Sequence, residues 1–127
     1  MSTSIKQWLP VVVYVVLIFY LSSIPGPQVP TPGGVDLSPI HIPLFFGLSY
    51  LIFRALERKG ATTAIILAIL LSTIYGVLDE VHQTFVPGRD FNILDITFNF
   101  IGSSLILLKF WKKATLSIRF RGRIIRL

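Results

Sequence analysis

Residues 75–102, with the sequence YGVLDEVHQTFVPGRDFNILDITFNFIG, decide what kind of protein this chain is. They place a dense set of polar side chains between two strongly apolar runs: Asp79, Glu80, His82, Gln83, Arg89, Asp90, Asp95 and Asn99. A charged side chain in hydrocarbon costs roughly 2.5–3.5 kcal/mol on insertion scales. Such a cluster beside membrane-length segments therefore indicates a functional site.

The chain contains four apolar runs, at residues 8–22, 40–56, 61–78 and 93–111, and the last two overlap the ends of this stretch. The chain of 127 residues is 53% hydrophobic, with a mean hydropathy of +0.73, which is too apolar for an ordinary soluble domain. Because a bilayer core about 30 Å thick needs about 20 helical residues, the first two runs must recruit flanking residues, thin the bilayer or tilt little. The sequence predicts an all-α fold, a four-helix transmembrane bundle formed by residues 1–113.

The basic residues indicate how this bundle is oriented. If both termini are cytoplasmic, 11 of the 12 lysines and arginines fall on the inner side, and Arg89 alone falls outside. The positive-inside rule favours this arrangement. Of the 6 acidic residues, all but Glu57 fall at or near the outer face. We therefore expect a multi-pass protein of the inner (cytoplasmic) membrane, with its polar cluster at the outer face.

The C-terminal residues 114–127 alternate arginine with isoleucine, phenylalanine and leucine. This pattern favours a basic amphipathic cytoplasmic tail that binds anionic lipids of the inner leaflet. The net charge of +6 is then explained by a membrane surface, and no nucleic-acid partner is expected. Cysteine is absent, which excludes a disulfide framework and a thiolate site. The oligomeric state stays open.

Prolines and glycines mark the connections. Pro10 is expected in the first turn of the first helix, where its missing N–H costs little. Residues 24–39 hold five prolines and three glycines and are expected to form a semi-rigid outer loop. Pro87 and Gly88 suit the central positions of a type II turn. That turn would direct Arg89 back toward the helix ends.

Three helix ends are expected to meet at one membrane depth. His41 begins the second apolar run, Asp79 and Glu80 end the third, and Asp95 begins the fourth. In the predicted orientation, all three ends lie at the outer face. Asp95 and Asn99 are one turn apart and share a helix face. The sequence therefore predicts one shared polar site.

The polar residues follow a specific order: Tyr75, then Asp79-Glu80-x-x-Gln83, then Pro87-Gly88-Arg89, then Asp95-x-x-x-Asn99-x-x-Gly102, with Ser22-Ser23-x-Pro25 and His41 before them. This order closely resembles the VanZ-like family of small membrane proteins. The family is named after an accessory protein of glycopeptide-antibiotic resistance that is linked to teicoplanin. The resemblance implies a bacterial cell-envelope protein with a role in teicoplanin-type resistance or envelope homeostasis, and it implies no established reaction.

Three interpretations of the cluster stay open. In the first, Asp79, Glu80, Arg89 and Asp95 form a structural ion-pair network, although a buried ion pair is weak evidence for stability. In the second, the cluster binds a membrane lipid, a lipid-linked envelope precursor or a lipophilic glycopeptide. Arg89 would then contact phosphate or carboxylate. The remaining side chains would bind sugar hydroxyls and peptide amides, and the expected ligand-binding residues are Ser22, Tyr75, Gln83, Arg89, Asp95 and Asn99.

The third interpretation is a membrane-embedded hydrolase or transferase acting on a lipid phosphate or glycolipid. Glu80 would be the general base, with Asp79 as its paired carboxylate, and His41 or His82 would carry the proton. Arg89 would stabilise developing negative charge. No cofactor is expected, because no dense ligand motif with established spacing is present. No metal is expected either: the residue types would allow one held by Glu80, His82 and Asp95, but His82 is expected at the rim, on the far side of its helix from Asp79.

Overall fold

The structure is a computed structural model that describes residues 3–29 and 37–111. Its main elements are four helices, α1 (Thr3–Ser22), α2 (His41–Leu56), α3 (Ala61–Gln83) and α4 (Ile93–Ser104). Short 3-10 helices occupy the connections: η1 (Gly26–Gln28), η3 (Ser38–Ile40) and η4 (Glu57–Lys59). These residues contain no strand, so the predicted all-α class is confirmed. The predicted tail, residues 114–127, lies outside the described part of the chain.

Each helix is long and apolar enough to cross a membrane. The four spans are Ser4–Ser22, Ser38–Lys59, Ala61–Gln83 and Ile93–Trp111, with lengths of 19, 22, 23 and 19 residues. The first two do gain length from flanking residues, as expected. Because α1 begins at Thr3, Pro10 lies inside the helix, and the prediction that it occupies the first turn was wrong. The protein is a multi-pass helical membrane protein.

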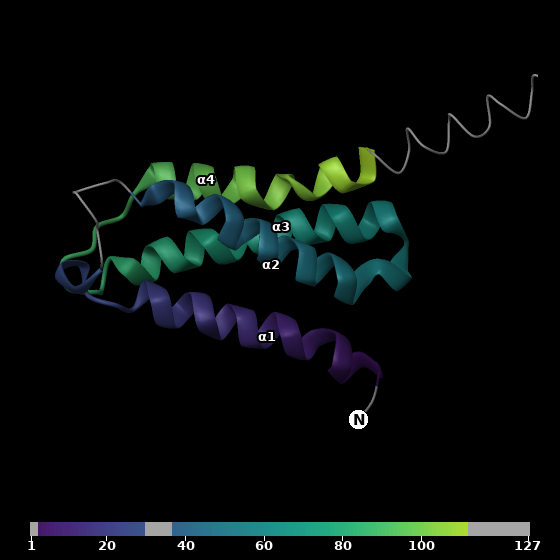
Figure 1. The fold of residues 1–127 in the computed structure, drawn as a ribbon, viewed down its shortest axis with the longest axis horizontal. Helices are drawn as coiled ribbons and strands as arrows, with labels where there is room; N and C mark the ends of the chain where they lie inside the picture. Colours follow the sequence, from purple (N-terminus) through teal and green to yellow (C-terminus); the bar gives the residue numbers. More distant parts are fainter. Residues whose placement is uncertain (1–2, 30–36, 112–127) are drawn as a thin grey trace, which may run out of the picture.

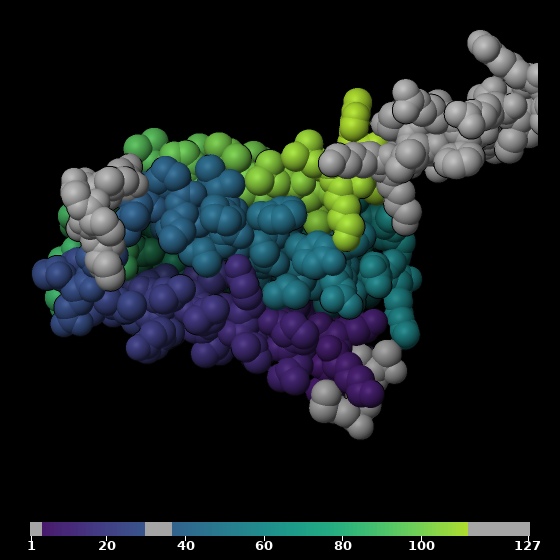
Figure 2. All heavy atoms as spheres, in the orientation of Figure 1, coloured from purple at the N-terminus to yellow at the C-terminus, as the bar shows by residue number. Residues whose placement is uncertain are grey.

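The helices form a bundle in which α2, α3 and α4 pack against one another (Figure 1). Helix α1 lies along one side of this group and packs on α2 and α3 (Figure 2). The last turns of α1 and α3 and the first turns of α2 and α4 gather at the same end (Figure 1). This meeting of helix ends is the arrangement expected from the sequence. Which end faces the cytoplasm stays a prediction from the basic residues.

An apolar core fills the bundle away from that end. We define the apolar core as Val11, Ile18, Phe45, Leu48, Ile52, Ala55, Leu56, Ala64 and Ala68. Large apolar side chains also cover the outside, and Leu70 is 51% exposed while Val16 is 59% exposed. Exposed apolar side chains around an apolar interior are what a lipid environment favours, since lipid tails are as apolar as leucine.

Close contact between α2 and α4 depends on a glycine. A Cβ atom at Gly102 would overlap the backbone of Ile42, including its carbonyl oxygen. Small residues at helix interfaces let backbones approach closely in membrane proteins. This approach places the first turn of α2 beside α4, so that His41 lies next to Asp95 and Asn99.

Three buried serines join α2, α3 and α4 through hydrogen bonds. Ser72 Oγ donates to Ser103 Oγ at 2.7 Å, and Ser103 Oγ donates to the carbonyl oxygen of Asn99 at 2.8 Å. Ser49 Oγ donates to the carbonyl oxygen of Ser103 at 2.9 Å. Each hydroxyl thus has a partner within the bundle, which burial of a polar group requires.

Candidate functional site at the polar end of the bundle

The end where the four helices meet is lined by buried polar side chains. We define the polar end as Ser22 from α1, His41 from α2, Asp79, Glu80 and Gln83 from α3, and Asp95 and Asn99 from α4. Glu80 and Asn99 are 0% exposed, and Asp79 and Gln83 are 3% exposed. The sequence placed all seven in a candidate site, and the structure brings them together.

One half of the polar end is a chain of hydrogen bonds between α1 and α3. Ser22 Oγ donates to Asp79 Oδ2 at 2.7 Å. Gln83 Nε2 donates to the same Asp79 oxygen at 3.1 Å and to Glu80 Oε1 at 3.3 Å. Asp79, Glu80 and Gln83 share the last turns of α3, so helical spacing alone sets their order. This chain holds the two neighbouring carboxylates in fixed orientations.

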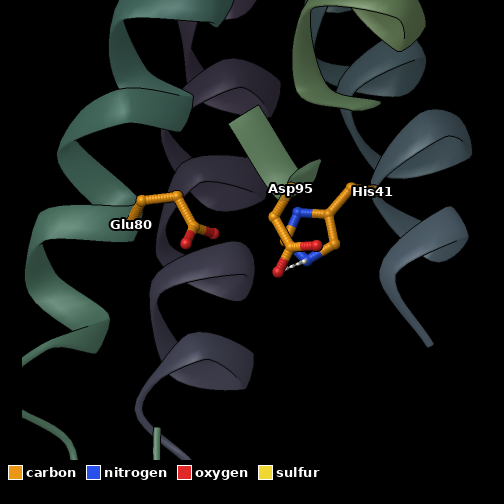
Figure 3. A group of neighbouring side chains, drawn as sticks. All are labelled: His41, Glu80 and Asp95. Carbon is orange, nitrogen blue, oxygen red and sulfur yellow. Dashed lines mark ion pairs between the residues drawn. The ribbon is translucent and has the colours of Figure 1, made fainter. Parts of the chain in front are cut away.

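The other half joins α2 to α4 and faces Glu80. His41 Nδ1 lies 2.8 Å from Asn99 Oδ1, and His41 Nε2 lies 3.7 Å from Asp95 Oδ2. An amide oxygen can only accept a hydrogen bond, so Nδ1 of His41 carries a proton. Figure 3 shows the side chains of His41, Glu80 and Asp95 pointing toward one another from three different helices.

Asn92 forms hydrogen bonds with both Glu80 and Asp95, and it was not among the residues predicted from the sequence. Its side-chain oxygen accepts from the backbone N–H of Leu94 at 3.0 Å, which caps α4. Its backbone N–H donates to Glu80 Oε2 at 3.1 Å, and its Nδ2 donates to Asp95 Oδ1 at 3.2 Å. An asparagine immediately before an apolar helical run is a recognisable N-cap signal. Its contacts with Glu80 and Asp95 are tertiary and leave no such signal.

Arg89 does not take the place expected for it in an ion-pair network. Its Nε donates to the carbonyl oxygen of Ile24 at 3.2 Å, and Nη2 lies 3.5 Å from that of Leu21. Nη1 reaches Gln83 Oε1 at 3.4 Å. In residues 3–29 and 37–111, no lysine or arginine forms an ion pair with Asp79, Glu80 or Asp95. Arg89 therefore fastens the end of α1 to α3, because the last carbonyls of a helix lack partners within the helix.

The turn that carries Arg89 has the predicted form. The backbone N–H of Arg89 donates to the carbonyl oxygen of Val86 at 3.1 Å, and Gly88 has a φ of +71°. A positive φ at the third position is what a type II turn requires. The backbone N–H of Gly26 also donates to the carbonyl oxygen of Pro87 at 2.9 Å, which ties this turn to the first loop.

Tyr75 and His82 lie outside the hydrogen-bonded polar end. The hydroxyl of Tyr75 donates to the carbonyl oxygen of Val15 at 2.9 Å, so this side chain links α3 to α1. His82 Nε2 lies 3.0 Å from Ser23 Oγ, and its ring stacks on Phe19 with centroids 4.4 Å apart. His82 thus faces α1, on another side of α3 from Glu80.

Two buried polar atoms of the polar end have no hydrogen-bond partner within the described residues. They are Asp79 Oδ1 and Asn99 Nδ2. An unpaired buried donor or acceptor typically costs about 1–3 kcal/mol. Unpaired atoms of this kind are available to a ligand, which would satisfy them on binding.

A group of three side chains has the composition of a cation site. One ligand atom from each of His41, Glu80 and Asp95 lies within 4.8 Å of the others. The residue types alone would also allow Glu80 and Asp95 with His82 as the third member. The structure substitutes His41, because α2 rather than the far side of α3 faces the two carboxylates (Figure 3).

Fold and site together define a multi-pass helical membrane protein with a buried acidic site at one end. The family described as VanZ/LLP1 matches residues 8–113, which include α2, α3, α4 and most of α1. The chain therefore belongs to the VanZ/LLP1 family, and the resemblance read from its motifs is confirmed. The comparisons found no matching curated protein and no matching solved structure.

Proposed function

We propose that this protein recognises the polar head group of a lipid-linked cell-envelope precursor, or of a lipophilic glycopeptide, at the outer leaflet of the bacterial cytoplasmic membrane. The supporting observation is that carboxylates, an imidazole and carboxamides from separate helices converge at one end of the bundle. These groups bind sugar hydroxyls and peptide amides through directional hydrogen bonds. The apolar helix surfaces beside them accommodate an acyl or prenyl chain.

The charge pattern supports a ligand role over a purely structural one. Asp79, Glu80 and Asp95 are buried without an arginine or lysine ion-pair partner among the described residues. Buried charges that are not paired are costly. An arrangement that served packing alone would gain by replacing at least one carboxylate with an apolar side chain. Binding to a head group gives these side chains a role that offsets their cost.

The family assignment supports a place in the cell envelope. The VanZ-like pattern implies an accessory role in teicoplanin-type glycopeptide resistance or in envelope homeostasis. Both resistance and envelope homeostasis could depend on such recognition, because a lipid-anchored precursor and a lipophilic glycopeptide each carry a polar head group on an apolar chain that inserts into the membrane. The predicted orientation brings the polar end to the leaflet that such ligands reach from outside.

One observation favours a second candidate, a hydrolase or transferase acting on a lipid phosphate or glycolipid. His41 is oriented by Asn99 and faces Asp95 and Glu80, which is an arrangement able to move a proton. In this candidate Glu80 activates water or a hydroxyl and His41 carries the proton. Arg89 contributes less than its sequence position suggests, because its donors contact backbone carbonyls and Gln83.

Native mass spectrometry of the purified protein tests recognition. Wild-type protein in mild detergent is expected to retain a copurified lipid that carries a phosphate or sugar head group. Asp95→Asn is expected to lose it, while Asp90→Asn, which alters an exposed acid outside the polar end, is expected to keep it. The proposal is wrong if no sample retains such a lipid, or if Asp95→Asn retains as much as wild type.

A further variant, Glu80→Gln, separates recognition from catalysis. A defined undecaprenyl pyrophosphate is incubated with wild-type protein, and release of inorganic phosphate or pyrophosphate is measured over time. Recognition alone predicts binding without release. Catalysis predicts release that disappears in Glu80→Gln while the lipid still binds.

A further inference from the structure

We propose that His41, Glu80 and Asp95 bind one divalent cation of the manganese-to-zinc type. Their ligand atoms lie within 4.8 Å of one another and come from α2, α3 and α4. Metal–ligand bonds of about 2.0–2.2 Å to nitrogen and oxygen place ligands on opposite sides of one ion a little over 4 Å apart. Small side-chain adjustments thus bring all three ligands onto one cation.

The protonation of His41 provides an independent observation. Because Asn99 Oδ1 accepts from Nδ1 at 2.8 Å, the neutral imidazole has its lone pair on Nε2. That nitrogen faces Asp95 Oδ2 across 3.7 Å, which is too long for a hydrogen bond. When the imidazole is neutral, two acceptors therefore face each other with Glu80 beside them (Figure 3). A cation between them satisfies all three.

Each proposed ligand is oriented by a hydrogen bond to an asparagine, and Glu80 also accepts one at Oε1 from Gln83. Asn99 holds the imidazole at Nδ1, and Asn92 donates to Glu80 Oε2 and Asp95 Oδ1. Histidine ligands in metal sites almost always donate their second N–H to such a partner, and ligating carboxylates are likewise hydrogen-bonded. Asn92, which is remote in sequence from Glu80, orients both acidic ligands at once.

The ligand types select the class of cation. An imidazole nitrogen with two carboxylates suits Mn²⁺, Fe²⁺, Co²⁺ or Zn²⁺, whereas Mg²⁺ and Ca²⁺ prefer oxygen ligands. Two carboxylates balance a charge of +2, which offsets the cost of burying Glu80 and Asp95 without a lysine or arginine partner among the described residues. Three protein ligands also leave coordination positions for water or for a phosphate oxygen.

This cation deepens the proposed function, on which its role toward a lipid rests. With Arg89 bound to the end of α1, the polar end as defined contains no lysine or arginine side chain for a phosphate. A cation held by His41, Glu80 and Asp95 supplies the positive charge that a phosphate or pyrophosphate head group needs. The substrate class that follows is a phosphate-bearing lipid rather than an uncharged glycolipid.

Electron paramagnetic resonance with Mn²⁺ tests the site directly. Protein in detergent is treated with a chelator, freed of it and titrated with Mn²⁺. We expect saturation at one Mn²⁺ per chain and a spin-echo modulation from a coordinated imidazole nitrogen. His41→Ala, Glu80→Gln and Asp95→Asn are expected to weaken binding by more than about tenfold. His82→Ala removes the other histidine of the chain and is expected to bind like wild type.

Controls keep the result interpretable when a variant folds poorly. Circular dichroism without cation shows whether each variant has kept the helix content of wild type. The nitrogen modulation is measured on wild-type protein, so it does not depend on the folding of any variant. The proposal is overturned if wild type shows no saturable site, if no nitrogen couples to Mn²⁺, or if a folded Asp95→Asn protein binds as tightly as wild type. Nitrogen coupling that disappears in His82→Ala instead of His41→Ala would also overturn it.

The proposed cation site and the proposed lipid recognition can be disproved separately. If chelator-treated protein keeps its copurified lipid and binds no Mn²⁺, the cation site is wrong and head-group recognition stands. If Mn²⁺ binds as described but no phosphate-bearing lipid is found in any sample, the cation site stands and the recognition of lipid fails.

Discussion

The apolar core around Leu48 and the polar end around Glu80 are both buried between α2, α3 and α4, yet burial has opposite consequences in the two regions. Leu48 and Glu80 are each 0% exposed. The apolar core gains van der Waals contacts from packing. The polar end instead holds three carboxylates at a cost that neighbouring hydrogen bonds only partly offset. The difference agrees with our proposal that the core maintains the fold while the polar end binds a ligand.

The largest effect on stability is expected from the core. Leu48→Ala leaves a cavity between packed helices and should lower the free energy of unfolding by about 2–5 kcal/mol. Unfolding in mixed detergent, followed by circular dichroism, measures this. Folded Leu48→Ala protein should still bind Mn²⁺ with wild-type affinity. Weakened Mn²⁺ binding by the folded Leu48→Ala protein would show that the apolar core and the polar end are coupled, and would contradict their separate roles.

A smaller loss of stability is expected from the arginine that joins α1 to the rest of the bundle. Arg89→Ala removes contacts to Ile24, Leu21 and Gln83 and should cost about 1 kcal/mol. Lysine cannot reproduce the planar fork of donors, so Arg89→Lys should restore little of that loss. The same unfolding assay measures both variants. Loss of Mn²⁺ binding in folded Arg89→Ala protein would place Arg89 in the site.

The smallest effect is expected on the lipid-facing surface. Leu70 is 51% exposed on α3, so Leu70→Ala exchanges one apolar contact with lipid or detergent for another. Its free energy of unfolding should stay within about 0.5 kcal/mol of wild type. This variant is the matched control for Leu48→Ala, and a loss as large as that of Leu48→Ala would mean that this face of α3 is covered by another protein surface.

Much of this arrangement could be predicted because it follows from local rules. Apolar run lengths indicated the four helices, and alternating chain direction brought His41, Glu80 and Asp95 to one end. Pro87 and Gly88 specified the turn through backbone preferences alone. Each of these inferences depends on residues that are close together in sequence or on the simple alternation of membrane spans.

Other features depend on tertiary register and could not be predicted in the same way. Arg89 contacts backbone carbonyls, which every residue has and no sequence motif marks. The contact between His41 and Asn99 requires the close approach that Gly102 permits. Pro10 was misplaced because the polar residues before the first apolar run continue as helix. The selection of His41 over His82 likewise depends on which helix packs beside Glu80.

The central claim is that the polar end binds a ligand at the expense of stability, and the melting temperature of Glu80→Gln tests it most directly. Without cation, this variant removes one of three clustered negative charges while keeping the side-chain shape, so it should melt at or above the wild-type temperature. Mn²⁺ should raise the melting temperature of wild type by binding the native state, and should leave that of Glu80→Gln unchanged. Two results together would contradict this claim: Glu80→Gln melts well below wild type without cation, and Mn²⁺ does not change the melting temperature of wild type. The polar end would then have a structural role.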